Sequence, residues 1–386
     1  MRRTDRRTSG RLDQVLNMVK QCYGNTPFEK IGEKLEIFLI EVKAAAETGS
    51  SNPGQVKAAT HYVEGLLRIL PKRFGERFYF DTLLIRNITD EWSKGPVKLP
   101  HTIIPSYGTS WGHRTVEMPS EVNEPRHCLE IVTFPFDDAP NDIDLLSYPW
   151  LYHELGHVLL SRHGERFCNS FEFELNKEIN RLRLRSVADK GTAKDKARQI
   201  IVKILNFWLP NTNEKNWAFE VASDVIALWT CGPSFLAAFQ DEVERDGVNP
   251  YEISKSHPPY ELRARVLMEA CKHLGWPEHL VAQDIISKWR RSSERKRIRA
   301  NELAAYASPD IFRTCLSCSL ATCKDLQLPM FDRTMITHTR ESVSKGVLPE
   351  LGADLLLVSR SLFTDQREIY DQWEHDIIRK FLDEFS

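Results

Sequence analysis

The apolar residues of the chain recur mostly at helical spacing. Near the N-terminus they repeat every three or four positions in the stretches 12–19, 31–42 and 63–70, which places them on one side of a helix. Similar stretches predict further helices at about 149–162, 171–187, 194–208, 215–229, 234–245, 259–273 and 278–298, and an amphipathic stretch spans 367–385. The pattern therefore predicts a mainly α protein.

Two short segments break this pattern. Thr102–Pro105 and Cys128–Phe134 are rich in β-branched residues and are bounded by proline, glycine and asparagine, as strands often are. They predict a small antiparallel sheet directly before the helix at about 149–162, and hence an α+β fold. We expect three regions, namely a helical N-terminal region at 1–95, a central region with the sheet at 96–285 and a helical C-terminal region at 286–386. A chain of 386 residues is long enough for more than one domain.

The charged residues of the chain nearly balance. It holds 52 lysines and arginines against 54 aspartates and glutamates, a net charge of −2 with neutral histidines. We therefore expect no global attraction to nucleic acid or to an anionic membrane. No apolar run is long enough to span a bilayer, and the basic start, Met1–Arg7, lacks the apolar segment that follows in a signal peptide. These features predict a cytoplasmic protein without a membrane span.

Two clusters allow more than one interpretation. Cys315, Cys318 and Cys323 could bind a metal or take part in redox chemistry, but a structural zinc needs four ligands and only the distant His338 could complete the set. We interpret the cluster as a helix with three reduced thiols. The run 288–299 holds seven lysines and arginines against one glutamate, and we interpret it as a solvated helix or connector rather than a nucleic-acid site.

One constellation carries specific chemistry. His153 and His157 stand four residues apart, so on a helix both imidazoles project from one face, as two nitrogen ligands of a tetrahedral zinc do. Glu154 lies between them and can reach a water at the metal without binding the metal itself. Gly156 weakens the helix by about 1 kcal/mol, which a packed backbone contact or crowding around the metal would explain. The segment therefore predicts a zinc site.

With this motif the chain resembles the zincin metallopeptidases, which share it on an active-site helix. The resemblance leaves two candidates for the third ligand. His163 stands at the tenth position after His153, where metzincins have their third histidine. Metzincins also have a glycine at the seventh position, where the helix ends, and this chain has Leu160 there. The other candidate is Glu220.

Glu220 and Asp224 share one face of an expected helix by their spacing of four residues. They resemble the E-x-x-x-D element of the gluzincins, which implies that Glu220 binds the zinc and Asp224 accepts a hydrogen bond from a ligand imidazole. Their neighbours are apolar, so the helix is expected to be buried, where unpaired carboxylates would be very costly. Three other acids serve as fallback ligands: Glu172, Glu174 and Glu178.

A third element lies at His257, Tyr260 and Arg263. It is similar to the His-Pro-Pro…Arg segment of several gluzincin peptidases, including the CAAX-processing type. His257 or Tyr260 could stabilise the oxyanion that forms when water attacks a carbonyl, and Arg263 could hold a helix or a carboxylate in place. The alternative is a helix-entry turn in which these side chains pack. The resemblance covers about residues 147–270, and the spacing from the histidines to the glutamate is longer than in the best-known gluzincins.

The resemblance implies a zinc-dependent metallopeptidase with a zincin-like domain at 96–285. Its substrate would be a protein or peptide, with Glu154 as the general base. The alternative is a catalytically silent zincin-fold protein, regulatory or scaffolding, that acts through its helical flanks and a regulatory partner. Glu154 favours the enzyme, because a site that only binds metal does not need an acid that is no ligand.

Overall fold

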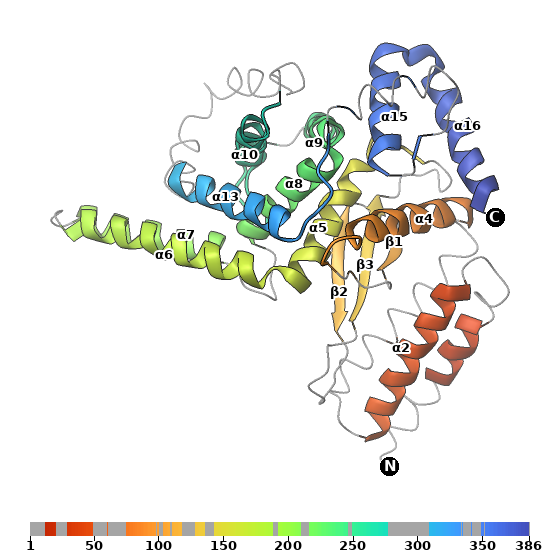
Figure 1. Cartoon of the computed structure of the whole chain (residues 1–386). Coiled ribbons are helices and arrows are strands. Elements are labelled where there is room, and N and C mark those ends of the chain that lie inside the picture. The colour runs from red at the N-terminus through yellow and green to blue at the C-terminus, as the bar shows by residue number, and fades with distance from the viewer. Residues whose placement is uncertain are drawn as a thin grey trace. The chain divides into compact units, whose positions relative to one another are not determined.

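The part of the chain described by the computed structural model is mainly helical, with one small sheet (Figure 1). The described residues are 12–20, 29–48, 60, 75–97, 99, 103–108, 110–117, 128–135, 143–187, 192–209, 216–245, 249–276, 309–332, 334, 341, 349–350 and 352–385. The strands are β1 (Ile103–Gly108), β2 (Gly112–Glu117) and β3 (Cys128–Pro135). The main helices are α2 (Glu29–Thr48), α4 (Gly75–Trp92), α5 (Pro149–His163), α6 (Glu165–Val187), α7 (Thr192–Trp208), α8 (Trp217–Cys231), α9 (Pro233–Arg245), α10 (Tyr260–His273), α13 (Pro309–Asp325), α15 (Ala353–Asp365) and α16 (Arg367–Phe385).

This arrangement confirms the expectation of a mainly α fold with a small sheet. The helices predicted between residues 149 and 273 are present as α5 to α10, and α16 covers the predicted stretch 367–385. Within the described residues, no helix has both the length and the apolarity of a membrane-spanning segment. Several predictions lie outside the described residues: the helices at 63–70 and 278–298, the basic run 288–299 and His338.

The chain folds into two compact units that alternate along the sequence. Unit 1 takes residues 1–90, 100–144 and 371–386, which include α2 and the sheet. Unit 2 takes residues 91–99 and 145–370, which include the helices from α5 to α15. Both units therefore combine segments that are distant in the sequence. The expected division into three consecutive regions, 1–95, 96–285 and 286–386, stays a prediction.

In unit 1, β3 lies between β1 and β2. Strand β1 runs parallel to β3, with Ile104 opposite Ile131, and β2 runs antiparallel to it, with Thr115 opposite Glu130. The prediction of an antiparallel sheet is therefore wrong for the β1–β3 pair. The reason is the strand order. Only residues 109–111 separate β1 from β2, and yet a strand from further along the chain pairs between them.

Strand β2 is not visible in the sequence pattern, because its side chains that contact Glu130 of β3 are polar. Nε2 of His113 lies 2.7 Å from Oε2 of Glu130, and the hydroxyl of Thr115 donates a hydrogen bond of 2.8 Å to the same oxygen. Glu130 is buried, so these two residues pair a buried carboxylate instead of adding to an apolar core. The apolar alternation by which a half-buried strand is recognised is therefore missing.

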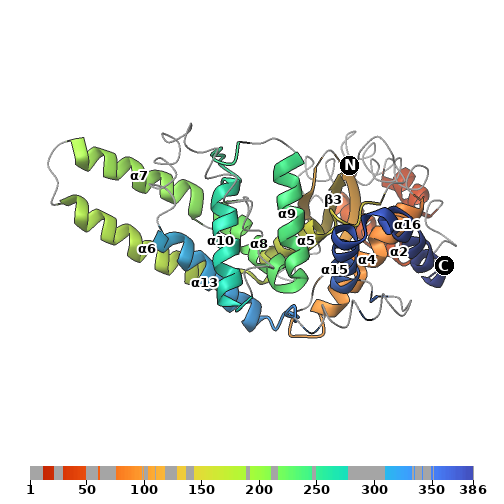
Figure 2. The ribbon, with the colours of Figure 1, turned by 90° about the horizontal axis from the view of Figure 1, so that it is seen from above.

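In unit 2, α5 packs against α8, and every residue of α8 is buried. Helices α9 and α10 flank α8 in the view from above (Figure 2), and α13 also contacts it. Asn216 begins the helix, since its side chain accepts hydrogen bonds from the N–H groups of Ala218 and Phe219. With neighbours on all sides, α8 is the central helix of this unit.

Helices α5 and α8 approach each other closely at Gly156. A Cβ atom at this position would lie 3.1 Å from Cα and 3.2 Å from Cβ of Ser223, shorter than the optimal separation of about 3.5–4.0 Å between carbon atoms. The packed backbone contact that the sequence suggests for this glycine is confirmed. The pair of helices can be this close only because position 156 has no side chain.

We expect Gly156→Ala to lower the free energy of unfolding by about 1–3 kcal/mol, because the added methyl group overpacks the interface. This loss outweighs the gain of about 1 kcal/mol in helix propensity. Urea unfolding followed by circular dichroism measures the change. Gly112→Ala is the matched control, since its Cβ would meet only Thr133 Cβ at 4.0 Å. A Gly156→Ala protein as stable as the wild type would contradict the close contact.

Candidate metal centre

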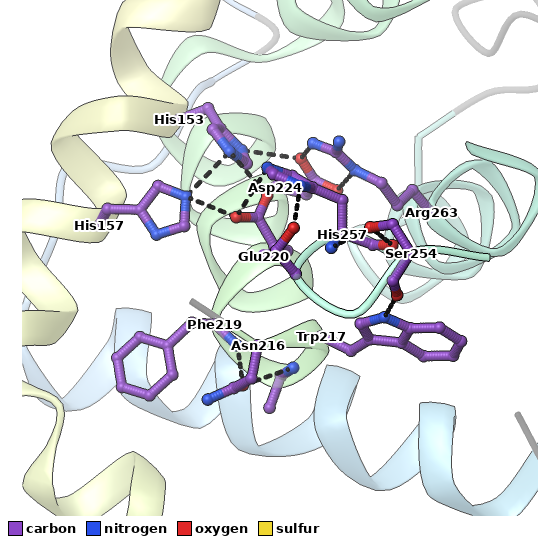
Figure 3. Close-up of polar contacts among 12 residues, drawn as sticks. His153, His157, Asn216, Trp217, Phe219, Glu220, Asp224, Ser254, His257 and Arg263 are labelled. Carbon is purple, nitrogen blue, oxygen red and sulfur yellow. Dashed lines mark hydrogen bonds and ion pairs between the residues drawn. The ribbon is translucent and has the colours of Figure 1, made fainter. Parts of the chain in front are cut away.

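The two histidines of α5 point toward each other (Figure 3). His153 and His157 lie one turn apart, and their Nε2 atoms are 3.1 Å apart. Both side chains are buried. Pro149 occupies the first turn of α5, where a proline costs no hydrogen bond. The helix thus presents two ring nitrogens to one small volume, as the spacing of the histidines predicts.

Helix α8 brings a carboxylate to the same volume. Oε2 of Glu220 lies 3.4 Å from Nε2 of His153, and Oε1 lies 3.4 Å from Nε2 of His157. One ligand atom from each of the three residues lies within 4.8 Å of the others, close enough to hold one metal ion. Glu220 stands in the first turn of α8, where the helix dipole favours a negative charge.

The spacing of these atoms fits a small cation. With zinc–ligand bonds of about 2.0–2.1 Å, tetrahedral geometry puts neighbouring ligand atoms about 3.3 Å apart, close to the 3.1 Å and 3.4 Å measured between these side chains. Oε1 of Glu220 is buried and accepts no hydrogen bond within the described part of the chain. A metal ion would satisfy this oxygen, since a buried acceptor without a partner is costly. The residues therefore fit a bound metal.

Asp224 and Arg263 hold the first histidine in place. Nδ1 of His153 lies 2.8 Å from Oδ1 of Asp224, so its N–H faces this carboxylate and Nε2 faces the other two residues of the group. The guanidinium of Arg263 donates two hydrogen bonds to Asp224, from Nη2 to Oδ1 at 2.6 Å and from Nε to Oδ2 at 2.7 Å (Figure 3). Asp224 thus contacts a ligand imidazole, as the E-x-x-x-D pattern implies, and Arg263 holds a carboxylate.

The charges of these side chains follow from burial and contacts. Burial alone would raise the pKa of Glu220, but the imidazoles of His157 and His153 hold that pKa well below its ordinary value. Burial also opposes ionisation of Asp224, whose pKa Arg263 and His153 lower. For His153, burial opposes the charge, yet hydrogen bonds to Asp224 and Glu220 raise its pKa to about 9. Burial lowers the pKa of His157. Both carboxylates are therefore ionised at neutral pH, and a metal ion at Nε2 of His153 would replace the proton that the ring holds there.

Glu154 lies on α5 beside the histidines and is buried. Its Oε2 has no hydrogen-bond partner among the described residues. It does not belong to the group that could hold the metal. A free carboxylate oxygen next to a metal position is what a general base needs.

His257 lies on the loop before α10 and reaches the site from another side. Its Nε2 is 3.5 Å from Oε1 of Glu220, and half of its side chain is exposed. Hydrogen bonds to Ser254 fix the loop. The hydroxyl of Ser254 accepts from the backbone N–H of His257 and donates to its carbonyl oxygen, and Trp217 Nε1 donates to the carbonyl oxygen of Ser254 at 3.0 Å. Neither Ser254 nor Trp217 is predicted as a support of this loop, because a turn contact and a contact across 37 residues leave no pattern in the sequence.

Tyr260 lies in a different environment. Its ring packs 5.6 Å from the guanidinium carbon of Arg263 and 5.7 Å from the ring of Phe239. These contacts match the packing alternative for Tyr260. A role as an oxyanion donor stays a prediction.

The other candidate ligands do not join the group. His163 is the last residue of α5, which continues as a helix through the buried Leu160. Glu174 and Glu178 pair instead with Lys177 and Arg181 on α6. Among the described residues, the metal group contains neither these nor Glu172. The grouping therefore favours Glu220 over His163 as the third ligand.

The cysteines of α13 belong to the packing. Cys315 and Cys323 are buried, Cys318 is partly so, and all three are free thiols. Cys315 Sγ donates to the carbonyl oxygen of Ala218 at 3.7 Å. Burial raises the pKa of the Cys315 thiol well above its ordinary value and that of Cys318 to about 11. Within the described chain, these thiols form no group with the spacing of a metal site.

In comparisons with protein families, curated proteins and solved structures, the chain matches none. The interpretation of the site therefore depends on its own geometry.

We expect the purified protein to bind about one metal ion per chain and Glu220→Ala to lose most of it, because a two-histidine site is too weak to retain the ion. His163→Ala is the matched control and should keep the metal. Elemental analysis after gel filtration measures both. Metal retained in Glu220→Ala and lost in His163→Ala would make the assignment wrong, and two ions per chain would point back to the cysteines.

Proposed function

We propose that the protein is a zinc-dependent metallopeptidase with a gluzincin-like site. One observation carries the proposal: three buried candidate ligands converge, and an acid beside them, Glu154, is outside the metal group and has an oxygen without a hydrogen bond among the described residues. A buried carboxylate without partners lowers stability. A protein that only bound metal or a partner would gain nothing from it, so its presence favours the enzyme over the silent regulatory protein.

The donor set supports zinc and a catalytic site. Two imidazole nitrogens and one carboxylate oxygen are typical zinc ligands, and catalytic zinc sites have three protein ligands with a further position open. Structural sites use four. A zinc ion bound there would polarise a water molecule and a substrate carbonyl. The peptide bond as substrate follows from the resemblance of His153, His157, Glu220 and Asp224 to the gluzincin motifs.

In this proposal Glu154 moves the protons. It accepts a proton from the water that attacks the scissile carbonyl, and it then delivers that proton to the leaving nitrogen. Its oxygen is free to do so, because no described group competes for it by a hydrogen bond.

His257 is the candidate for stabilising the oxyanion that forms on the substrate carbonyl. A side chain beside Glu220 that is half exposed can meet a substrate carbonyl and donate a hydrogen bond as negative charge develops on its oxygen. The hydrogen bonds between Ser254 and the backbone of His257 fix the loop segment that carries this side chain.

Glu154→Gln should keep the fold and the metal and abolish hydrolysis, because an amide cannot accept the proton of water. The measurement is a comparison of protein N-termini in cells that express the wild type or the variant, with Glu172→Gln, an exposed acid on α6, as the control. New N-termini are expected with the wild type and with the control. The same new N-termini in cells with Glu154→Gln would contradict the proposed mechanism. If neither the wild type nor either variant produced new N-termini, the result would favour the regulatory protein.

His257→Phe should lower kcat by about 10²–10³-fold if His257 donates to the oxyanion, with unchanged metal content. The assay is turnover of a peptide derived from a cleaved site found as above. Tyr260→Phe is the comparison, and its expected loss is smaller because the ring packs on Arg263. Full turnover in His257→Phe would remove the residue from the mechanism.

A further inference from the structure

The carboxylate of Asp224 contacts two side chains, those of His153 and Arg263. Oδ1 faces both Nδ1 of His153, at 2.8 Å, and Nη2 of Arg263, at 2.6 Å. Oδ2 accepts a further hydrogen bond from Nε of Arg263 at 2.7 Å. Two parallel bonds from a planar guanidinium fix the plane of a carboxylate as well as its position. Arg263 therefore determines how Asp224 presents Oδ1 to the histidine.

Arg263 is itself held by aromatic rings from three helices. Its guanidinium carbon lies 5.4 Å from the rings of Trp150 on α5 and Phe239 on α9, and 5.6 Å from that of Tyr260 on α10. The side chain is buried. Rings at this distance attract a cation, and they suit the flat guanidinium of arginine. The ammonium of lysine is not flat and lacks the guanidinium fork, the pair of parallel N–H donors that binds both oxygens of a carboxylate. We call Trp150, Phe239 and Tyr260 the aromatic cage.

One ring of the cage also contacts the ligand. Trp150 meets the His153 imidazole edge to face at 5.3 Å between ring centres, and the ring of Phe235 lies nearly parallel to the imidazole at 6.3 Å. The histidine thus contacts two aromatic rings, and Asp224 faces its Nδ1. At Nδ1 the ring faces the carboxylate that Arg263 orients, and at Nε2 it faces His157 and Glu220, the other two residues of the metal group.

We infer that Arg263 is a positioning residue of the metal centre. It acts through Asp224, holding the His153 imidazole with Nε2 toward the ion, and it needs the guanidinium fork for this as well as the positive charge. The inference rests on the proposed function, since it assumes that His153 binds a metal. It goes beyond that proposal in assigning metal affinity to a residue that touches no ligand.

The test uses the full chain, with zinc alone as the probe and a chelator as competitor. Arg263→Lys keeps the charge and loses the fork, and it should weaken zinc binding about 10–100-fold, as loss of a group that orients a ligand does. Cobalt(II) in place of zinc should show an altered visible absorption spectrum, because the ligand geometry changes. A purely structural arginine would lower the melting temperature and leave both readings of the folded protein unchanged.

A double-mutant cycle separates action through Asp224 from an independent effect. Asp224→Asn and Arg263→Lys together should weaken zinc binding little more than Asp224→Asn alone, because both remove the same constraint. The matched control is Arg360→Lys, since Arg360 of unit 2 pairs with Asp241 at 2.6 Å and neither residue belongs to the metal group. It should leave affinity and spectrum as in the wild type.

Three outcomes overturn the inference. One is an Arg263→Lys protein with wild-type affinity and spectrum, and another is a cycle in which the two losses add. The third is a wild type that takes up no zinc, which removes the proposed function as well and is seen before any variant is made. If Arg263→Lys does not fold, Phe239→Leu keeps the fork and opens the aromatic cage. It should weaken zinc binding in the same direction, and unchanged affinity and spectrum there would also overturn the inference.

Discussion

Two ionised carboxylates on a helix that is buried on every side are the constraint on which unit 2 depends. Glu220 and Asp224 are both inaccessible to solvent, and a charge in such a place must be compensated or it destabilises the fold. Asp224 is compensated by Arg263. Among the described residues, Glu220 forms ion pairs with the imidazoles of three histidines, and a bound cation would add positive charge beside it.

The surrounding structure follows from this need. The residue that begins α8, Asn216, places Glu220 in the first turn. The missing side chain of Gly156 lets α5 bring its histidines within reach of that turn. The aromatic cage then fills the space around Arg263 without competing for its hydrogen bonds. Packing and charge thus specify the same arrangement, which is typical of a sequence that encodes one structure.

The parts of the site that could be predicted are those fixed by short spacing. His153 and His157 share a face because four residues make about one turn, and Glu220 and Asp224 share one for the same reason. Apolar neighbours of Glu220 indicate burial. The contact of His257 with Glu220 and the partner of Arg263 were only possibilities in the sequence, because they depend on how α10 crosses α8. Strand β2 and the order of the sheet were missed, since a polar strand has no apolar alternation and spacing along the chain does not give strand order.

The alternation of the two units along the chain has a consequence for how the protein could be divided. The backbone passes from one unit to the other after residues 90, 99, 144 and 370, so no single cut yields a fragment with one whole unit and nothing else. Most of α16, from residue 371 on, belongs to the unit that also holds residues 1–90. During synthesis, unit 1 therefore lacks residues 371–386 until all of unit 2 has been made. Exchange of either unit for another domain would therefore need cuts at several positions, whereas an insertion into a loop leaves the segments of both units in place.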